Sequence, residues 1–308
     1  MSTDLAEEAP PIDGAALLKI KKPLPRVGWL LGVAWLVLLG FCALFAYQLP
    51  FIRDYGTKVK VDGRSKSYGW GPGWNAWFGT DKSSYDVFAR CIYGARMTLL
   101  IGIGATIIGL VFGSLLGILG GYFRGRMDRF TSIVVDCLLA LPALLLALLL
   151  IYRLDDLKVQ VGFWNVTRPW EITITLGILA IAPLARIVRA QTLSMREREF
   201  VLAARSLGAK NGRIIIREIL PNLVPAMLTV AFTGLGILIA AEGALAFLGL
   251  GVESPQTWGK MINASRDDLE QAWWATLIPC MFLLLTVISF NIIGDHMARR
   301  FDIREAAI

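Results

Sequence analysis

The chain has very few of the side chains from which metal and catalytic sites are usually built. It contains a single histidine, His296, and four cysteines, none of which form a Cys-x-x-Cys pair. A metal site therefore has little support. The cysteines all lie in or beside apolar runs, and we interpret them as buried, unreactive thiols. No nucleophile with a partnering base can be assembled from these residues, which argues against a membrane-anchored enzyme.

The chain also lacks a nucleotide-binding loop. Its nearest string, GAKNGR at residues 208–213, does not have the Gly-Lys-Ser/Thr ending that cradles phosphate groups. We therefore expect that this chain binds no cofactor and hydrolyses no ATP by itself. Its net charge of +7 has no soluble basic domain to carry it, so we expect no nucleic-acid partner.

Charged residues are missing from several long stretches. Of the 308 residues 56% are hydrophobic, and the mean hydropathy is +0.59, which is too apolar for an ordinary soluble domain. Crossing the hydrocarbon core of a bilayer takes about 20 apolar residues in a helix. Four uncharged gaps are longer than that, between Arg26 and Arg53, Arg96 and Arg124, Glu218 and Glu242, and Glu270 and Asp295.

Two further apolar stretches carry charges inside them. Residues 130–152 are interrupted by Asp136, and residues 172–193 contain Arg186 and Arg189 in their last turns, where a guanidinium can reach a polar interface. With both included, the sequence predicts an all-α membrane protein with six transmembrane helices. The predicted spans are 27–52, 97–122, 130–152, 172–193, 222–248 and 275–297, the last five lying in a core domain over residues 97–298.

The distribution of basic residues predicts that both ends of the chain lie in the cytoplasm. With the N-terminus inside, the cytoplasmic pieces hold 18 of the 31 lysines and arginines, and the two short outer loops hold five. The other eight lie in residues 53–96, an outer segment long enough to weaken the positive-inside rule. Residues 1–26 form a cytoplasmic tail that we predict to be disordered. Residues 299–308 form the second cytoplasmic tail.

The first apolar run, residues 27–52, has one alternative interpretation as a cleaved signal peptide, because the basic string KIKKPLPR precedes it. It is longer than a typical signal-peptide core. A small residue is also needed two positions before Ala46, where Leu44 stands. We therefore predict an uncleaved membrane anchor.

A polar, basic segment at residues 199–221 separates two apolar runs. The pattern NGRIIIREIL places Ile215, Ile216 and Ile219 on one helical face. The sequence predicts two short helices that break at Gly208, where glycine permits a sharp turn, and that end at the following proline before the next span begins. Periodicity alone also allows an amphipathic helix that lies on lipid headgroups.

The spacing within this segment resembles the cytoplasmic EAA loop of ABC importer permeases. Ala203-Ala204 is followed four residues later by Gly208, and Leu220-Pro221 begins twelve residues after that. Further matches extend from about residue 78 to residue 305, and together they are similar to the permeases of dipeptide, oligopeptide and nickel importers. The matching strings are FGTDKSSYDVFARCIYGARMTLLIG, GYFRGRMDRF, VDCLLALP, LSMREREFVLAARSLGA, AFLGLGVESPQTWG and FNIIGDHMARRFD.

This resemblance implies the type I fold of ABC importer permeases and a part in the ATP-driven uptake of peptides or a related small solute. It implies four kinds of neighbour: a second homologous permease chain, two ATPase subunits that carry ATP and Mg²⁺, an extracytoplasmic solute-binding protein, and the inner membrane of a bacterial or archaeal cell. Alternating access would be driven through the 199–221 segment. The residues implied for docking on the ATPase are Ala203, Ala204, Gly208, Leu220 and Pro221.

The chain departs from the family pattern at three places. Leu202 stands where the EAA loop usually has its glutamate, which removes one ion pair with the ATPase. Glu218 occupies a position that is usually isoleucine. In the outer segment Ser84-Tyr85 replaces the usual Gly-Arg, so a gate function cannot be carried over to that place.

Two carboxylates inside the predicted spans are candidates for the solute path or its gate. Glu242 is surrounded by small residues that would allow close helix approach, and Asp136 precedes Pro142 by six residues. For both, the alternative is a structural polar contact with a neighbouring helix.

The outer face has its own candidates for a rim that meets the binding protein. They are Trp70, Trp74, Asp81 and Trp258. The alternative for the tryptophans of the outer segment is anchoring at the membrane interface.

The sequence does not identify the transported solute. Another solute such as nickel is an alternative within the same family. A stand-alone secondary transporter is a further alternative, although neither inverted repeats nor paired intramembrane charges are evident.

Overall fold

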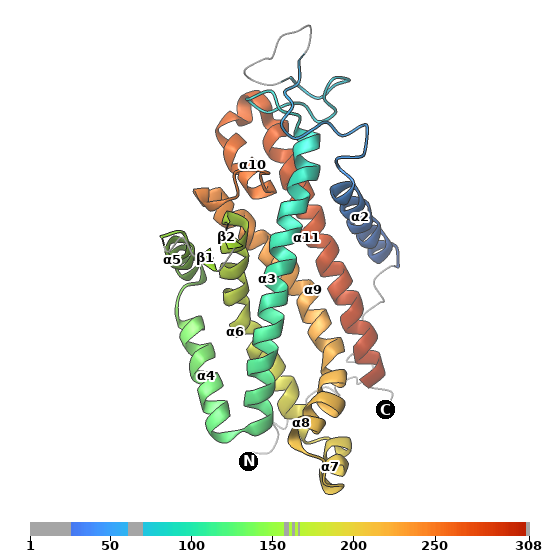
Figure 1. Cartoon of the computed structure of the whole chain (residues 1–308). Coiled ribbons are helices and arrows are strands. Elements are labelled where there is room, and N and C mark those ends of the chain that lie inside the picture. The colour runs from blue at the N-terminus through green and yellow to red at the C-terminus, as the bar shows by residue number, and fades with distance from the viewer. Residues whose placement is uncertain (1–25, 61–69, 157–159, 162–163, 166, 306–308) are drawn as a thin grey trace, which may run out of the picture.

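The computed structural model describes residues 26–60, 70–156, 160–161, 164–165 and 167–305. Residues 1–25 of the predicted N-terminal tail and residues 306–308 of the predicted C-terminal tail lie outside this part of the chain. The described part is a bundle of long helices, shown in Figure 1. The long helices are α2 (Arg26–Leu44), α3 (Val87–Phe123), α4 (Gly125–Ala140), α5 (Ala143–Asp156), α6 (Arg168–Arg196), α9 (Leu220–Leu245) and α11 (Leu269–Glu305).

Shorter elements close the two ends of the bundle. At one end lie α7 (Glu199–Ser206), α8 (Asn211–Ile214) and the π-helical turn η1 (Ile215–Ile219). The other end carries η2 (Ala246–Leu250), α10 (Trp258–Ser265) and the 3₁₀ turn η3 (Arg266–Asp268). The strands β1 (Gln160–Val161) and β2 (Trp164–Asn165) form a two-residue antiparallel pair between α5 and α6.

The predicted all-α membrane architecture is confirmed, with one change in the third span. Within the described residues, five helices are long and apolar enough to cross a membrane, and there are six if the bent pair α4–α5 is counted as one span. The two halves of that pair meet at 92° instead of forming one straight span over 130–152. The break falls at Leu141, which is extended (φ −87°, ψ 135°) because proline at the next position disfavours a helical residue before it.

Helices α3, α6 and α11 extend beyond the spans predicted for them, whereas α2 ends at Leu44 and not at residue 52. Helix α3 begins at Val87, inside the predicted outer segment 53–96. Asp86 caps it by accepting from the N–H groups of Phe88 (2.9 Å) and Ala89 (3.3 Å). At the other end of the chain, α11 stays helical to Glu305, through most of the predicted tail.

Glycines allow α3 and α6 to pack closely along their length. Gly109, Gly113 and Gly117 recur every four residues on one face of α3. A Cβ atom on Gly117 would lie 2.7 Å from the carbonyl oxygen of Ala185, and one on Gly113 would lie 2.9 Å from that of Ile181. The two backbones are therefore in contact, which is the packing that small residues four apart permit in membrane helices.

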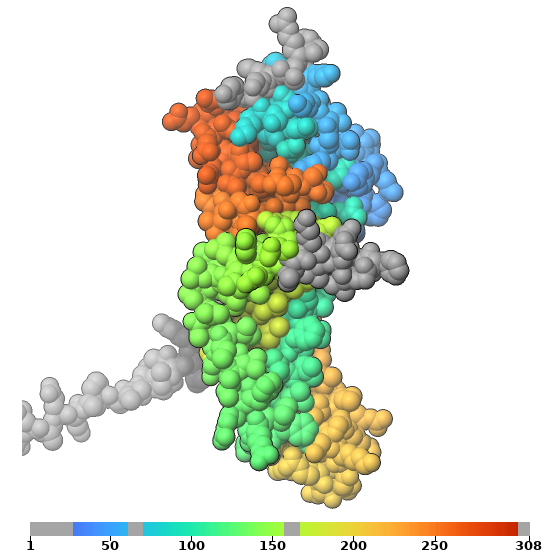
Figure 2. All heavy atoms as spheres, turned by 60° about the vertical axis from the view of Figure 1, so that its left-hand side comes forward, coloured from blue at the N-terminus to red at the C-terminus, as the bar shows by residue number. Residues whose placement is uncertain are grey.

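Helix α2 lies at the edge of the bundle and packs on α11. The indole Nε1 of Trp35 donates to Thr286 Oγ1 at 3.1 Å, and Trp29 stacks on His296 with 5.1 Å between ring centroids. The single histidine of the chain is therefore engaged in helix packing. In Figure 2, α4 and α5 (green) cover one face of the bundle, and the α7–η1 region (yellow) projects from its lower end.

Candidate functional site

The 199–221 segment forms a compact helix–turn–helix at one end of the bundle. Helix α7 ends in a Schellman motif, in which the N–H of Gly208 donates to Arg205 O at 3.0 Å and that of Ala209 to Ala204 O at 3.1 Å. Gly208 has φ +78°, the left-handed region in which a side chain is strained. The sharp turn predicted at Gly208 is therefore present.

The inner face of this segment is buried against the ends of the spanning helices. Val201, Ile214, Ile219 and Leu223 are each 0% exposed. They belong to one cluster with residues of α3 and α6, namely Ile118, Tyr122, Val188 and Met195. The phenol of Tyr122 donates to Asn211 Oδ1 at 2.9 Å and ties the end of α3 to the start of α8. A displacement of the segment would therefore move α3 and α6 with it.

The structure corrects the prediction that the second short helix ends at Pro221. Helix α8 continues through η1 into α9 without a break, so residues 211–250 are one helical run. The π-helical turn accommodates the proline. Its backbone hydrogen bonds already join residues five apart instead of four, and the N–H that Pro221 lacks would fall at this place. The same turn shifts the buried face, because residues five apart align in a π turn. Ile216, predicted to be on the apolar face, is consequently 65% exposed.

The outer surface of the segment displays most of the residues implied for docking. Ala203, Gly208 and Pro221 are exposed, whereas Ala204 and Leu220 are half-buried. Leu207 is 88% exposed and Leu202 48%. Leu207 is not among the residues predicted from the sequence. Its signal is an apolar residue immediately before the glycine of a polar turn.

Ion pairs join α6 to α4 and to the end of α3 above this segment. Arg124 pairs with Glu197, and Arg189 Nε lies 2.5 Å from Asp128 Oδ1. Arg186 Nη2 lies 3.1 Å from Asp136 Oδ1. The interhelical polar contact considered for Asp136 is thus present, but its side chain remains 66% exposed and that of Arg186 62%.

Glu242 lies in the last turns of α9 and is fully buried. Neither of its carboxylate oxygens makes a close hydrogen bond within the described part of the chain, and the polar neighbour of the carboxyl group is Thr257, at the start of α10. The polar contact considered for Glu242 is therefore with the side chain of Thr257. The surroundings are tightly packed, since a Cβ atom on Gly259 of α10 would lie 2.6 Å from Gly243 Cα. Because Glu242 is 0% exposed, it does not line an open path in this conformation.

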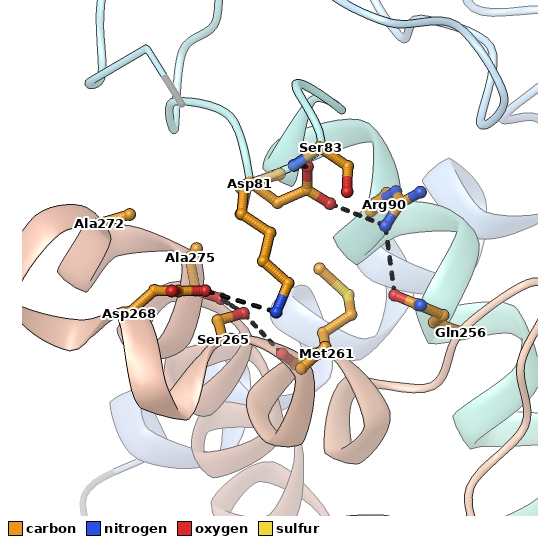
Figure 3. Close-up of a pocket in the computed structure, with 12 residues that line it drawn as sticks. Asp81, Ser83, Arg90, Gln256, Met261, Ser265, Asp268, Ala272 and Ala275 are labelled. Carbon is orange, nitrogen blue, oxygen red and sulfur yellow. Dashed lines mark hydrogen bonds and ion pairs between the residues drawn. The ribbon is translucent and has the colours of Figure 1, made fainter. Parts of the chain in front are cut away.

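A small polar pocket of about 120 Å³ lies at the opposite end of the bundle, between the outer segment, α3 and the α10–α11 hairpin (Figure 3). Arg90 lines one side of it, with Nη1 2.8 Å from Asp81 Oδ2 and 3.3 Å from Gln256 Oε1. The Arg90 guanidinium also lies 3.9 Å from the ring centroid of Tyr85. Asp81 accepts a further bond from the N–H of Ser83 at 2.8 Å. The Asp81 carboxylate is therefore held in place inside the fold.

Other contacts clamp the outer segment to the hairpin. Trp274 Nε1 donates to Thr80 O at 3.0 Å, and Lys82 Nζ lies 3.7 Å from Asp268 Oδ2. Burial raises the pKa of the Asp86 carboxyl at the start of α3, although the N–H groups of Ala89 and Phe88 and the charge of Arg53 oppose this.

The four residues predicted for the outer rim are in different environments. Trp74 is 100% exposed, Trp70 is half-buried, and Asp81 faces the pocket around Arg90. Trp258 is 0% exposed and donates through Nε1 to Cys91 O at 2.8 Å, so its prediction as a rim residue is wrong. It starts α10 and is buried because it fills the space between α10 and α3. Among the described residues, no group of three or more His, Cys, Asp or Glu could hold a metal ion.

The arrangement of spans with one projecting helix–turn–helix defines a multi-pass helical membrane protein, and solved structures share this fold. The fold is similar to a chain of the methionine ABC transporter MetNI in inward-facing conformations, with a TM-score of 0.57 and 17% identity over 70% of this chain and 97% of that one. It is also similar to an amino acid ABC transporter chain, with a TM-score of 0.53 and 17% identity over 69% and 94%. The fold is that of an ABC importer permease.

Sequence comparison identifies the family. Residues 94–303 match the model of the binding-protein-dependent transport system inner membrane component, and the chain belongs to this family. It is 38% identical to a dipeptide transport system permease protein of Alkalihalophilus pseudofirmus, over 75% of this chain and 73% of that protein. It is 33% identical to a glutathione transport system permease protein of Pectobacterium atrosepticum (75% and 74%) and 32% to an oligopeptide one of Bacillus subtilis (89% and 84%).

Several predictions are thereby decided. The chain is a multi-pass inner-membrane permease component of an ABC importer of the peptide and glutathione family, and it is not itself the ATPase. It carries no cofactor site of its own. A binding-protein-dependent system of this class works with ATPase and solute-binding partners. The alternative of a stand-alone secondary transporter is therefore wrong.

Proposed function

We propose that this chain forms half of the solute path of an ATP-driven importer and receives the movement of the ATPases through residues 199–221. The observation that carries this is the burial of Val201, Ile214 and Ile219 against α3 and α6, with Tyr122 bonded to Asn211. A force applied to α7 therefore reaches two spanning helices through packed side chains. The positive-inside count supports a cytoplasmic location for this segment and for both chain ends.

The exposed surface of the segment supports an apolar contact with the ATPase. Leu202 replaces the glutamate of the EAA pattern, and Leu207, at the end of α7, is 88% exposed. Large exposed apolar side chains at a rigid tip are typical of an anchor for a partner's pocket. Ala203, Ala204 and Gly208 keep the tip narrow, and Leu220 and Pro221 connect it to α9.

The remaining partners follow from an importer that alternates its access. A second, homologous but distinct permease chain completes the path, and two ATPase subunits bind ATP and Mg²⁺. The outer surface around Trp70, Trp74 and Asp81 meets the solute-binding protein, since a fully exposed Trp74 is suited to such a contact. Glu242 acts at the gate, because a fully buried carboxyl group whose oxygens make no close hydrogen bond favours a second conformation in which it is hydrated.

Short peptides are the solute class that the relatives support best, since the names of three relatives state dipeptide, glutathione and oligopeptide transport. Nickel is the alternative within the family, and no observation on this chain favours it. Uptake of a labelled dipeptide, glutathione and nickel by cells expressing the complete system would decide among them. Nickel uptake without peptide uptake would overturn the peptide assignment.

The coupling assignment is tested by affinity purification of the full chain from mild detergent, followed by mass spectrometry. We expect recovery of ATPase subunits and a second permease with the natural chain. With Leu207→Glu we expect the second permease but not the ATPases. Equal recovery of the ATPases with both chains would overturn the docking role of this tip.

A further inference from the structure

One spanning helix exposes a surface that differs in chemistry from the others. On α3, α11 and α2, the residues exposed along the middle of each helix are all apolar; on α3 they are Leu100, Ile103, Ile107, Val111, Phe112 and Leu115. On α6, after Trp170 in the first turn, the exposed residues begin again at Pro183 and follow one face of the helix. This surface, the α6 stripe, consists of Pro183, Arg186, Ile187, Ala190, Gln191 and Ser194.

The Asp136–Arg186 pair is the most unusual part of this surface. Asp136 lies eleven residues into α4, about 16 Å from its start at the helical rise per residue, which places it inside the apolar part of that helix. Its neighbours Ile133 and Leu139 are 56% and 43% exposed. The two charged side chains are nonetheless 66% and 62% exposed. Charged groups at this depth face protein or water and not lipid.

A purely structural role would not require this exposure. The Asp128–Arg189 pair joins the same two helices, and its side chains are only 27% and 32% exposed. The geometry of α4 and α6 can therefore shelter an ion pair. The Asp136–Arg186 pair, by contrast, is exposed, and Gln191 and Ser194 are exposed on the same face of α6. A water-filled lining has this arrangement.

We propose that the α6 stripe and Asp136 line an aqueous part of the solute path, and that the Asp136–Arg186 pair suits this part to small zwitterions. This rests on the proposed importer function. A zwitterion carries an ammonium and a carboxylate, and a neighbouring pair of opposite charges attracts both without holding either sign in excess. Gln191 and Ser194 supply neutral hydrogen-bonding groups. Contacts of this kind are weak enough for a solute to leave, as a path requires.

Thiol labelling tests the water contact without any transported solute. Gln191→Cys and Ala190→Cys would be made separately in the complete transporter, in membranes open on both sides, and treated with a small charged methanethiosulfonate reagent that does not enter lipid. Leu207→Cys is the water-exposed control, and Leu284→Cys on α11 is the lipid-facing control. Mass spectrometry of the digested protein measures the modification of each introduced cysteine separately from that of the native cysteines.

We expect modification of both stripe cysteines at rates within about tenfold of Leu207→Cys, and none at Leu284→Cys. Two positions are used so that misfolding of one variant does not decide the result. Absence of labelling at both stripe positions, as at Leu284→Cys, would mean that lipid or a protein interface covers α6 and would overturn the proposal.

Charge substitutions test the second half of the proposal. The ratio of labelling rates for an anionic and a cationic reagent would be measured at Gln191→Cys. With Asp136→Asn the ratio should rise about two- to threefold, which is the effect of one unit charge several ångströms away in water, and with Arg186→Gln it should fall by as much. Asp136→Arg with Arg186→Asp should restore it. Unchanged ratios would overturn the charge assignment. Because labelling needs no ATPase, the outcome is independent of the Leu207→Glu purification that tests coupling.

Discussion

Tyr122 at the end of α3 donates a hydrogen bond of 2.9 Å to Asn211, the first residue of α8. It joins a spanning helix to the projecting segment, in addition to the apolar cluster around Ile214 and Ile219. Tyr122 is 4% exposed, so its phenyl ring stays packed if only the hydroxyl is removed. The contribution of this bond can therefore be measured separately from that of the packing.

We predict that Tyr122→Phe lowers the free energy of unfolding by about 1 kcal/mol and weakens ATP-driven uptake without releasing the ATPases. Asn211→Ala should have a similar effect, and the double variant should be no worse than either single one. Thermal unfolding in detergent and uptake by proteoliposomes provide the two measurements. Fully additive effects would show that the bond does not couple the two residues.

The turn at Gly208 should not tolerate a side chain, although there is open space around it. Its φ of +78° makes Gly208→Val unfavourable by about 1–2 kcal/mol, concentrated in the turn. We expect normal membrane insertion and a loss of ATP-coupled uptake. Gly212→Val is the matched control, since a Cβ there also meets open space and φ is not positive. Normal uptake by Gly208→Val would contradict the role of the turn.

The outer pocket offers two ion pairs with different expected contributions. Arg90→Ala leaves the Asp81 carboxylate without its cationic partner, and both side chains are less than one-fifth exposed. We predict a loss of about 2–4 kcal/mol, seen as faster proteolysis of the outer segment. Lys82→Ala breaks the pair with Asp268, in which Lys82 is 55% exposed, and should cost less than about 1 kcal/mol. Equal proteolysis rates for the two variants would contradict the ranking.

Glu242 should be unfavourable for stability and required for transport. Methionine has a similar length and no polar atoms that need partners, so Glu242→Met should raise the free energy of unfolding by about 1–3 kcal/mol. Uptake should be lost if the carboxylate acts at the gate. Thermal unfolding and uptake are measured on the same preparation. A variant that is less stable but still transports would identify Glu242 as a structural residue only.

The class of this protein could be predicted from its sequence. Long uncharged runs impose spanning helices because the bilayer leaves backbone groups no other partners, and the basic residues predict the orientation. The turn at Gly208 was also predictable, because glycine is the residue type that adopts a positive φ without strain. The spacing of Ala203-Ala204, Gly208 and Leu220-Pro221 indicated the family because it depends on local order alone.

Which side chains are buried together depends on the tertiary fold. The π turn moved Ile216 to the surface, and packing against α3 buried Trp258, because both depend on helix register and on neighbours distant in the sequence. In the sequence, Asp136 and Glu242 have the same pattern, because each is a single charged residue in an apolar run. The fold pairs Asp136 with Arg186 on an open surface and encloses Glu242 away from water, near Thr257. The pairing of Asp136 and the burial of Glu242 depend on how the helices pack against one another. The periodicity of residues along a single helix does not predict that packing.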